Sequence, residues 1–381
     1  MHADLLMGID VGTSLCKSVL FDRAGRQLGA GVAPTPWRAV PTGAEMDADR
    51  LFDAVTAAVG SALDRHPDGG VAAIGVTSMA ETGVLMDRHG DPVAPMIAWF
   101  DRRGEDEARS LAAQLPWFTA TTGLQPGPTP SIAKHRWLLD HHEPAASGRR
   151  WLNVAEWVVH ALGGEDVAEL SLASRTGYLH LRRSGWWPDA LSWVGLPAGL
   201  LPQPSPAGTP AGRCRVGPER IRGARLAVGG HDHPCAAVGA GVVRTGEVLV
   251  SMGTAQALLR ALTPPVPRPV VEAAVAAGMS IGWHAIEARQ LVMAGCPFGQ
   301  VLNEHPDQLD TLVSRIAGCL RAMDDLFGPH ERKVAVGGWT RKTEVLDAER
   351  RALGQLEAMP ELEAGCWGAA LMAGRATGVM E

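Results

Sequence analysis

The first residues whose types and spacing could do chemistry lie in the segment GIDVGTS, residues 8–14. A turn at Gly12 lets backbone N–H groups approach an anion closely, and the hydroxyls of Thr13 and Ser14 can donate further hydrogen bonds. Asp10, at the end of an expected strand, could hold a metal-bound water beside a phosphate. The segment therefore predicts a phosphate-binding loop, although a polar hairpin turn would use the same residues. It is neither a Walker A loop nor a G-x-G-x-x-G sequence.

A second glycine-threonine turn occurs much later in the chain, at SMGT, residues 251–254. Gly253 and Thr254 repeat the chemistry of the first turn, with the same alternative of an ordinary turn. Lys17, just after the first turn, could add a positive charge. If each turn binds phosphate from one lobe of the protein, ATP would lie between the lobes, where phosphoryl transfer needs donors, a metal and exclusion of water.

A carboxylate follows an expected strand in the segment GGHDHP, which contains Asp232. A carboxylate at this place can accept the proton of a substrate hydroxyl as that oxygen attacks a phosphorus atom. His231 and His233 flank it, so a His-x-His metal site of a hydrolase is an alternative interpretation. An aspartate that only caps a turn is a third.

An aromatic residue stands next to charged residues in WFDRR, which contains Trp99, Asp101 and Arg103. Carbohydrate sites combine an aromatic face with carboxylate and guanidinium groups that bind hydroxyls in a fixed geometry. Glu81, in TSMAETG, follows a strand and could reach the same pocket. Taken singly, Trp99 could equally pack on the surface and Glu81 could be solvated.

The elements that position these residues follow from hydrophobic periodicity. Apolar runs predict strands over residues 4–10, 17–22 and 27–32, and a turn at residues 87–90 predicts a further hairpin. Leu51, Val55, Val59 and Leu63 recur every four residues, as in an amphipathic helix, and the strand VAAIGVTS follows it. The first 100 residues therefore read β-β-β-α-β and contain antiparallel pairs, unlike a purely parallel sheet.

The second half of the chain restarts this pattern. The stretch VVRTGEVLVSMGTAQALL again has an apolar strand, a Gly-Thr turn and another apolar run, which indicates an internal repeat and a domain boundary near residue 242. Apolar residues between 309 and 323 predict a long helix, the strand KVAV meets Gly337 and Gly338, and residues 363–373 predict a helix of small residues.

Composition limits the classes of protein. The 381 residues suffice for two domains, and a net charge of −6 without long charged runs argues against binding nucleic acid. No apolar run is long enough for a membrane span, and the first residues lack the basic region of a secretory signal. The six cysteines form no C-x-x-C pair, so we expect neither a zinc site nor disulfides, and we expect a cytoplasmic location.

Taken in order, these motifs resemble the FGGY carbohydrate kinases, which belong to the actin-like ATPase superfold, and the resemblance covers most of the chain. Each motif is short, and their shared order makes the resemblance specific. It is carried by GIDVGTSLCKSVLFDRAG, AIGVTSMAETGVLMDRHGDPVAPMIAWFDRR with its W-x-D-x-R, LASRTGYLHL, GGHDHPCAAVGAG, VLVSMGTA, VAVGGW and EAGCWGAALMAG.

The resemblance implies an α/β fold of two actin-like (ribonuclease H-like) lobes, with mixed sheets flanked by helices and a ligand cleft between the lobes. The lobes would span residues 1–242 and 243–381, and the cofactors would be ATP and Mg²⁺. The implied roles are Asp232 as catalytic base, Asp10 for magnesium, Thr13, Ser14, Lys17, Gly253 and Thr254 for the phosphates, Gly337 and Gly338 for adenosine, and Glu81, Trp99, Asp101 and Arg103 for the sugar.

We therefore expect ATP-dependent phosphorylation of a hydroxyl of a small sugar or polyol, with no nucleic-acid or membrane partner and with a homodimer as an allowed assembly. Three departures qualify the resemblance. The stretch between Thr254 and Gly337 is short, Trp339 follows the adenosine motif, and Glu81-Thr82 stand where xylulose-kinase-like members usually have Met-His. One alternative is a catalytically impaired protein of this fold that binds ligand and regulates a partner. The other is a metal hydrolase that uses His231, Asp232 and His233.

Overall fold

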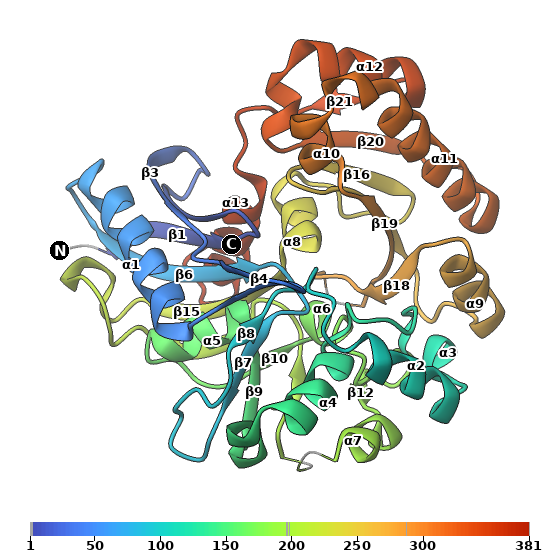
Figure 1. The fold of residues 1–381 in the computed structure, drawn as a ribbon. Helices are drawn as coiled ribbons and strands as arrows, with labels where there is room; N and C mark the ends of the chain where they lie inside the picture. Colours follow the sequence, from blue (N-terminus) through green and yellow to red (C-terminus); the bar gives the residue numbers. More distant parts are fainter. Residues whose placement is uncertain (1–2, 196, 198, 287, 381) are drawn as a thin grey trace.

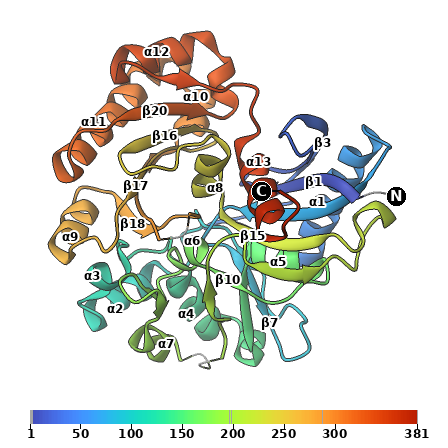
Figure 2. The same ribbon diagram turned by 180° about the vertical axis from the view of Figure 1, so that it is seen from behind.

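Two six-stranded sheets form the framework of the protein, and two helices lie between them (Figure 1). The structure is a computed structural model, which describes residues 3–195, 197, 199–286 and 288–380. Figure 2 shows from behind that the same two helices, α8 (Asp232–Gly239) and α13 (Ala364–Ala376), occupy this central place.

The first sheet is mixed, with the order β14-β15-β6-β1-β2-β3. The neighbours β15, β6 and β1 run parallel, whereas β1, β2 and β3 form an antiparallel meander. Helix α1 (Ala48–Asp64) buries Leu51, Val55 and Val59 against this sheet. The strands are β1 (Ala3–Val11), β2 (Leu15–Phe21), β3 (Gln27–Pro34), β6 (Gly70–Ser78), β14 (Pro210–Arg213) and β15 (Arg225–His231).

The second sheet repeats the mixed pattern, with the order β18-β19-β17-β16-β20-β21. Strands β16, β17, β19 and β18 pair in antiparallel fashion, and β20 runs parallel to β16 as β6 does to β1. The strands are β16 (Glu247–Met252), β17 (Gln256–Leu262), β18 (Ser280–Trp283), β19 (Gln290–Cys296), β20 (Arg332–Val336) and β21 (Glu357–Ala358). Its helices are α9 (Arg268–Ala276), α10 (Phe298–Glu304), α11 (Leu309–Phe327) and α12 (Thr343–Leu353).

A third group of elements extends from the first sheet and has its own buried cluster, which includes Phe118, Tyr178 and Trp187 (Figure 1). Its helices are α2 (Glu105–Gln114), α3 (Phe118–Thr122), α4 (Ser131–His141) and α7 (Pro188–Val194). The elements that join it to the first sheet are β4 (Arg38–Val40), β5 (Gly43–Met46), β7 (Gly83–Met86), β8 (Met96–Ile97), β9 (Arg150–Asn153), α5 (Val154–Ala161), β10 (Ala168–Glu169), α6 (Leu170–Ala173), β11 (Leu179–His180), β12 (Gly185–Trp186) and β13 (Pro204–Ser205).

The central helices approach their neighbours through glycines. The side chains of β1 alternate, so that Met7 and Ile9 face the core under α1, whereas Leu6 and Gly8 face α13. A β-carbon on Gly8 would collide with the carbonyl oxygen of Cys366 in α13. Gly239 and Gly368 allow an equally close crossing of α8 and α13. Small residues therefore set the distance between the sheets and the helices that separate them.

The predicted fold class and the long helix at residues 309–323 are confirmed. The predicted β-β-β-α-β order holds for the strands of the first sheet, but two short strands, β4 and β5, are inserted before α1. The turn predicted at residues 87–90 exists, and beyond it Met86 and Pro92 form an isolated antiparallel bridge, with the Val93 N–H donating to the Leu85 carbonyl oxygen at 2.9 Å. The predicted hairpin stays this short, because Pro92 and Pro95 supply no N–H for a longer ladder, and β7 pairs with β9 and β8 with β5 instead. The boundary at residue 242 stays a prediction, with the addition that α13 packs on the first sheet.

We predict that Gly8→Ala lowers the free energy of unfolding by about 2 kcal/mol or more, because the new methyl group overpacks the contact with α13. The matched control is Gly60→Ala within α1, where no atom lies within 4 Å of the new β-carbon. That change should raise stability by about 0.5–1 kcal/mol, because alanine favours a helix more than glycine does. Urea unfolding measures both, and equal effects would contradict the close-packing interpretation.

Candidate active site

The two glycine-threonine turns meet. Ser14 Oγ lies 3.0 Å from Thr254 Oγ1, although 240 residues separate them in sequence. Both residues are exposed, so these hydroxyls can exchange partners with a ligand. A residue outside the first turn also holds it, because the Trp99 indole N–H donates to Thr13 Oγ1 at 3.0 Å. The structure thus brings the two predicted phosphate loops to one place.

Asp10 is the last residue but one of β1 and lies on the face that α13 covers. Its Oδ1 atom is buried and has no hydrogen-bond partner among the described residues. Gly365 adjoins it so closely that a β-carbon there would lie 2.6 Å from Oδ2. Burial, together with the negative charge of Asp232, raises the pKa of Asp10 to about 7. A buried carboxylate of this kind is a suitable ligand for a cation, which would stabilise its ionised form.

Lys17 is paired within the protein. Its Nζ atom donates to Glu363 Oε2 at 2.7 Å, just before α13 begins. Burial opposes the charged form, but Glu363 outweighs it and raises the pKa of Lys17. The predicted contact of Lys17 with phosphate stays a prediction, and it would require Lys17 to share its charge with Glu363.

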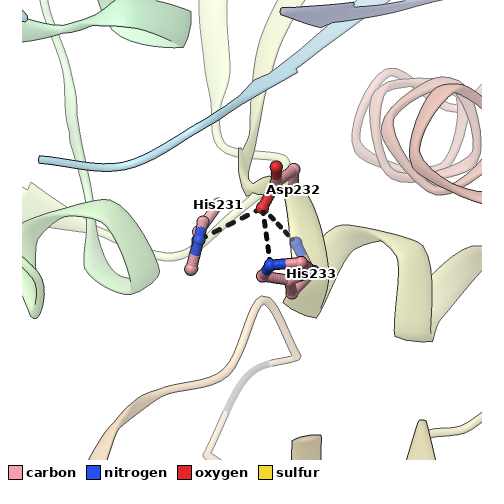
Figure 3. Close-up of side chains that lie close together, drawn as sticks. All are labelled: His231, Asp232 and His233. Atoms are coloured by element: carbon pink, nitrogen blue, oxygen red, sulfur yellow. Dashed lines mark hydrogen bonds and ion pairs between the residues drawn. The ribbon is translucent and has the colours of Figure 1, made fainter. Parts of the chain in front are cut away.

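Asp232 begins α8 directly after β15, where the strand and the helix meet (Figure 3). Its Oδ1 atom accepts the backbone N–H of His233 at 2.7 Å and lies 3.1 Å from His231 Nε2. Burial favours the neutral acid, but His233 and His231 reverse this effect and hold the pKa of Asp232 well below its usual range. Asp232 is therefore ionised at neutral pH and can accept a proton.

The segment before α8 is fixed by a buried network. The His231 backbone N–H donates to Ser171 Oγ at 2.9 Å, and Ser171 in turn donates to Glu169 at 2.6 Å. Gly230 has a φ of +97°, and a β-carbon there would meet Ser171 Oγ at 2.5 Å. Only glycine fits this combination of conformation and space, which sets the direction in which Asp232 leaves the strand.

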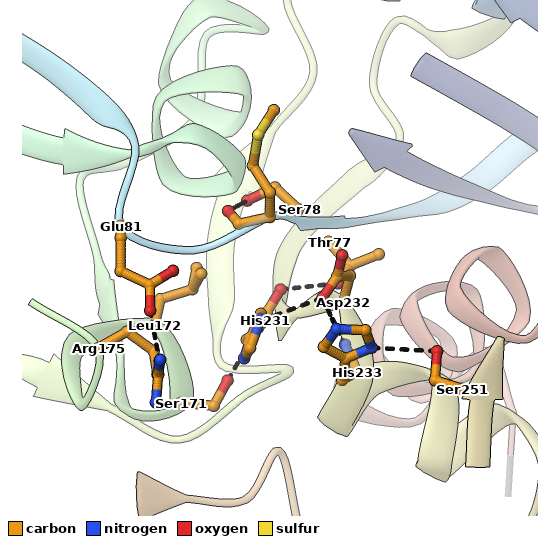
Figure 4. Close-up of polar contacts among 12 residues, drawn as sticks. Thr77, Ser78, Glu81, Ser171, Leu172, Arg175, His231, Asp232, His233 and Ser251 are labelled. Carbon is orange, nitrogen blue, oxygen red and sulfur yellow. Dashed lines mark hydrogen bonds and ion pairs between the residues drawn. The ribbon is translucent and has the colours of Figure 1, made fainter. Parts of the chain in front are cut away.

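Glu81 lies near His231 and is held by Arg175, a residue to which the sequence motifs assigned no role (Figure 4). Arg175 Nε donates to Glu81 Oε1 at 2.6 Å, and its Nη1 donates to Ser280 Oγ of β18 at 2.8 Å. Arg175 thereby connects Glu81 with the second sheet. One feature of the sequence could have indicated a role for Arg175: in LASRTGYLHL it is the one charged residue among apolar and small neighbours.

Asp101 and Arg103 bind each other. Arg103 donates from Nε and Nη2 to the two carboxylate oxygens at 3.0 and 2.9 Å, and it also pairs with Glu45 at 2.6 Å. The Asp101 side chain is 0% exposed and that of Arg103 is 9% exposed. Their polar atoms are thus largely used within the protein, and they support the backbone beside Trp99. Direct contact of Asp101, Arg103 and Trp99 with a sugar stays a prediction.

A hollow of about 330 Å³ opens beside the second turn. Gly253 and Thr254 line it, and so does the end of the predicted adenosine motif. Gly337, just before that end, has a φ of +102°, and a β-carbon there would lie 2.5 Å from the carbonyl oxygen of Met252. The Trp339 ring packs edge-on against Phe298, with ring centres 6.2 Å apart. The remaining lining residues are Asn303, Gly338, Trp339 and Lys342.

The comparisons with known proteins identify the class. The profile of the FGGY family of carbohydrate kinases, N-terminal domain, matches residues 5–239. The chain therefore belongs to the FGGY family of carbohydrate kinases. This membership agrees with two mixed sheets whose glycine-threonine turns converge near an ionised aspartate.

The matches to individual relatives have low sequence identity. The chain is 29% identical over 265 residues to a glycerol kinase of Thermococcus gammatolerans, a match that covers 67% of this chain and 53% of the relative. It is 24% identical over 261 residues to a gluconokinase of Bacillus licheniformis, with coverages of 66% and 51%. The chain thus spans about half the length of the curated relatives that it matches.

Solved structures agree on the fold. A xylulose kinase of Brucella ovis superposes with a TM-score of 0.86 at 22% identity, covering 99% of this chain and 91% of the other. A glycerol kinase of Plasmodium falciparum with ADP gives 0.85 at 15% identity, with coverages of 100% and 91%. Among the described residues, no helix has the length and apolar character needed to cross a membrane. The expected cytoplasmic location and homodimer stay predictions.

We predict that Asp10→Asn removes a pH dependence of stability. A carboxyl group whose pKa is raised by folding stabilises fully at low pH, and this contribution is lost as the pH rises through its folded pKa of about 7. Relative to the wild type, Asp10→Asn should therefore gain about 2–3 kcal/mol between about pH 5 and about pH 8. Urea unfolding without divalent cations measures this, and parallel pH profiles for the two proteins would contradict it.

Proposed function

We propose that the protein transfers the γ-phosphoryl group of ATP to a hydroxyl of a small sugar or polyol. The observation that carries this proposal is the convergence of both glycine-threonine turns, joined by Ser14 and Thr254, with an ionised Asp232 whose neighbour His233 contacts Ser251 of the second turn. The family includes kinases of glycerol and gluconate, which supports an alcohol as the acceptor.

Asp232 would accept the proton of the attacking hydroxyl. Because its charge is maintained by His231 and His233, it would be in the basic form at neutral pH. The backbone N–H of His233 and the imidazole of His231 fix Oδ1, so one carboxylate oxygen serves as the anchor and the other is left for the acceptor. This orientation limits the reorganisation that the reaction requires.

The donors for the phosphates would come from both sheets. Thr13 and Ser14 contribute hydroxyls from the first turn, and Gly253 and Thr254 contribute from the second. The adenosine would occupy the hollow of about 330 Å³ beside Gly338. The exposed contact between Ser14 and Thr254 would be replaced by contacts to phosphate oxygens, so neither hydroxyl would lose a partner.

The residues present fit a magnesium ion. Asp10 Oδ1 is buried without a partner, and its pKa is raised by burial and by Asp232, so a divalent cation would compensate both effects. When bound, magnesium would neutralise charge on the phosphate oxygens. Asp10 would hold it, directly or through water, and Gly365 leaves the space for it beside the carboxylate.

The acceptor would lie between Asp232 and Glu81. Glu81 is buried and its carboxylate is oriented by Arg175, so the pair offers both acceptor and donor groups to neighbouring hydroxyls. The backbone of Glu81 has a φ of +61°, which is unusual for a residue with a side chain and is typical of functional sites.

We predict that Asp232→Asn lowers kcat by about 10²–10⁴-fold, because the amide cannot accept the proton. ADP release, measured across a panel of ketoses, aldoses and polyols, gives the rate. The control is Asp53→Asn on the exposed side of α1, which should keep full activity. Full turnover by Asp232→Asn would overturn the role of the base. Calorimetric binding of magnesium–ATP without turnover of any acceptor would instead support a regulatory protein of this fold.

We predict that Arg175→Met raises the KM for the acceptor by about 10–100-fold, because Glu81 loses a charge-assisted hydrogen bond worth about 1.5–3 kcal/mol. The KM for ATP should change little. Ser280→Ala, which removes the contact of Arg175 with β18 and keeps its contact with Glu81, should change the acceptor KM much less. An unchanged acceptor KM in folded Arg175→Met would show that the pair is only structural.

A further inference from the structure

The junction of β15 and α8 gathers three groups that can ligate a metal ion. One nitrogen each from His231 and His233 and one oxygen of Asp232 all lie within 4.8 Å of one another. The distances to Asp232 Oδ1 are 3.1 Å from His231 Nε2 and 3.8 Å from His233 Nε2 (Figure 3). This cluster differs in chemistry from Asp10, which offers oxygen alone.

The donor set selects the class of cation. Two imidazoles and a carboxylate suit zinc and similar transition metals, whereas magnesium prefers oxygen donors and retains its water. A tetrahedral zinc ion with bonds of about 2.0–2.2 Å places neighbouring donor atoms about 3.3–3.6 Å apart. The observed spacings bracket this value, so small side-chain rotations of His231 and His233 would complete the geometry.

The surroundings support this geometry. His233 Nδ1 lies 3.1 Å from Ser251 Oγ, so its proton can be held there while Nε2 faces Asp232 (Figure 4). The side chains of His231, Asp232 and His233 are 8%, 25% and 19% exposed, so an ion can enter and a water can complete its shell.

We propose that His231, Asp232 and His233 form a binding site for one zinc-like transition-metal dication, which blocks Asp232 as proton acceptor and so inhibits the protein. A cation bound to Oδ1 would draw negative charge away from the carboxylate, so that the other oxygen, which is left for the acceptor hydroxyl, would become a weaker proton acceptor. The inhibition rests on the proposed kinase function, whereas the binding of the metal does not. Ser251 acts as a positioning residue, because it orients His233 without touching the metal.

Calorimetry with zinc chloride tests the site directly, using the full chain treated with a chelator and dialysed, without ATP or acceptor. We expect one bound zinc per chain, retained in excess magnesium. His231→Gln and His233→Gln should each weaken binding by at least about 10-fold, and Ser251→Ala should weaken it by about 10-fold through orientation alone. His305→Gln, at an exposed histidine, and Cys319→Ser, at the cysteine that is least buried, should leave it unchanged.

Thermal melts would show whether each variant is folded. If a histidine variant is not folded, Ser251→Ala still tests the site. No zinc binding by the wild type, or binding unchanged in His231→Gln, His233→Gln and Ser251→Ala, would overturn the proposal. If an acceptor is found, zinc should lower kcat at saturating acceptor and saturating ATP, because it weakens the base and leaves the substrate sites free. Zinc binding with no turnover of any acceptor would contradict the kinase function alone, and turnover that zinc does not inhibit would overturn the block of Asp232.

Discussion

The close approach of α13 to the first sheet and to α8 is the constraint on which the rest of the structure depends. Gly8 on β1 and Gly75 on β6 leave room for the backbone of α13, and Gly239 and Gly368 let the two central helices cross without intervening side chains. The spacing places the start of α8 beside the end of β1. Asp232 and Asp10 are therefore neighbours because of this backbone packing, although they lie far apart in the sequence. A larger residue at these glycines would displace the carboxylates as well as the helices.

This neighbourhood explains why the two carboxylates respond in opposite directions. Both side chains are partly buried, and burial by itself would raise the pKa of each. Asp232 has two histidines and a backbone N–H beside it, which more than compensate its burial, whereas the cation nearest to Asp10 is Lys17, already paired with Glu363. Asp10 also experiences the negative charge of Asp232. Asp10 therefore lacks a positive charge that would compensate its burial. A divalent cation bound there would relieve its repulsion with Asp232, which the fold imposes.

Much of the framework could be predicted from the sequence because it depends on local patterns. The apolar runs of β1 and β16, the four-residue spacing of α1 and the glycines of the turns are visible in short windows. The pairing of β7 with β9 could not be predicted in this way, since 64 residues separate Met86 from Arg150 and no local signal links them. For the same reason the partner of Glu81 was missed, because Arg175 lies 94 positions away. Lys17 was predicted to face a ligand from its charge and Arg103 from its place beside Trp99 and Asp101, but neither pattern reveals that Glu363 and Glu45 would pair with them. Sequence motifs therefore located the reactive groups, and the tertiary fold decided which of them have polar atoms left to use.

The contacts between the two sheets are of two physical kinds, and the difference bears on how a ligand could enter. Where α8 crosses α13, the contact at Gly239 and Gly368 is backbone against backbone. Around the site the contacts are polar ones between side chains, which join Ser14 to Thr254, His233 to Ser251 and Arg175 to Ser280. Hydroxyl contacts at exposed positions cost little to exchange, because water or phosphate oxygens can replace the lost partner. We therefore expect the polar edge to open and close on ligands while the glycine-lined helices hold the two sheets together. Because the crossing of α8 and α13 stays fixed, Asp10 and Asp232 would keep their mutual positions while the donors of the two turns rearrange around phosphate.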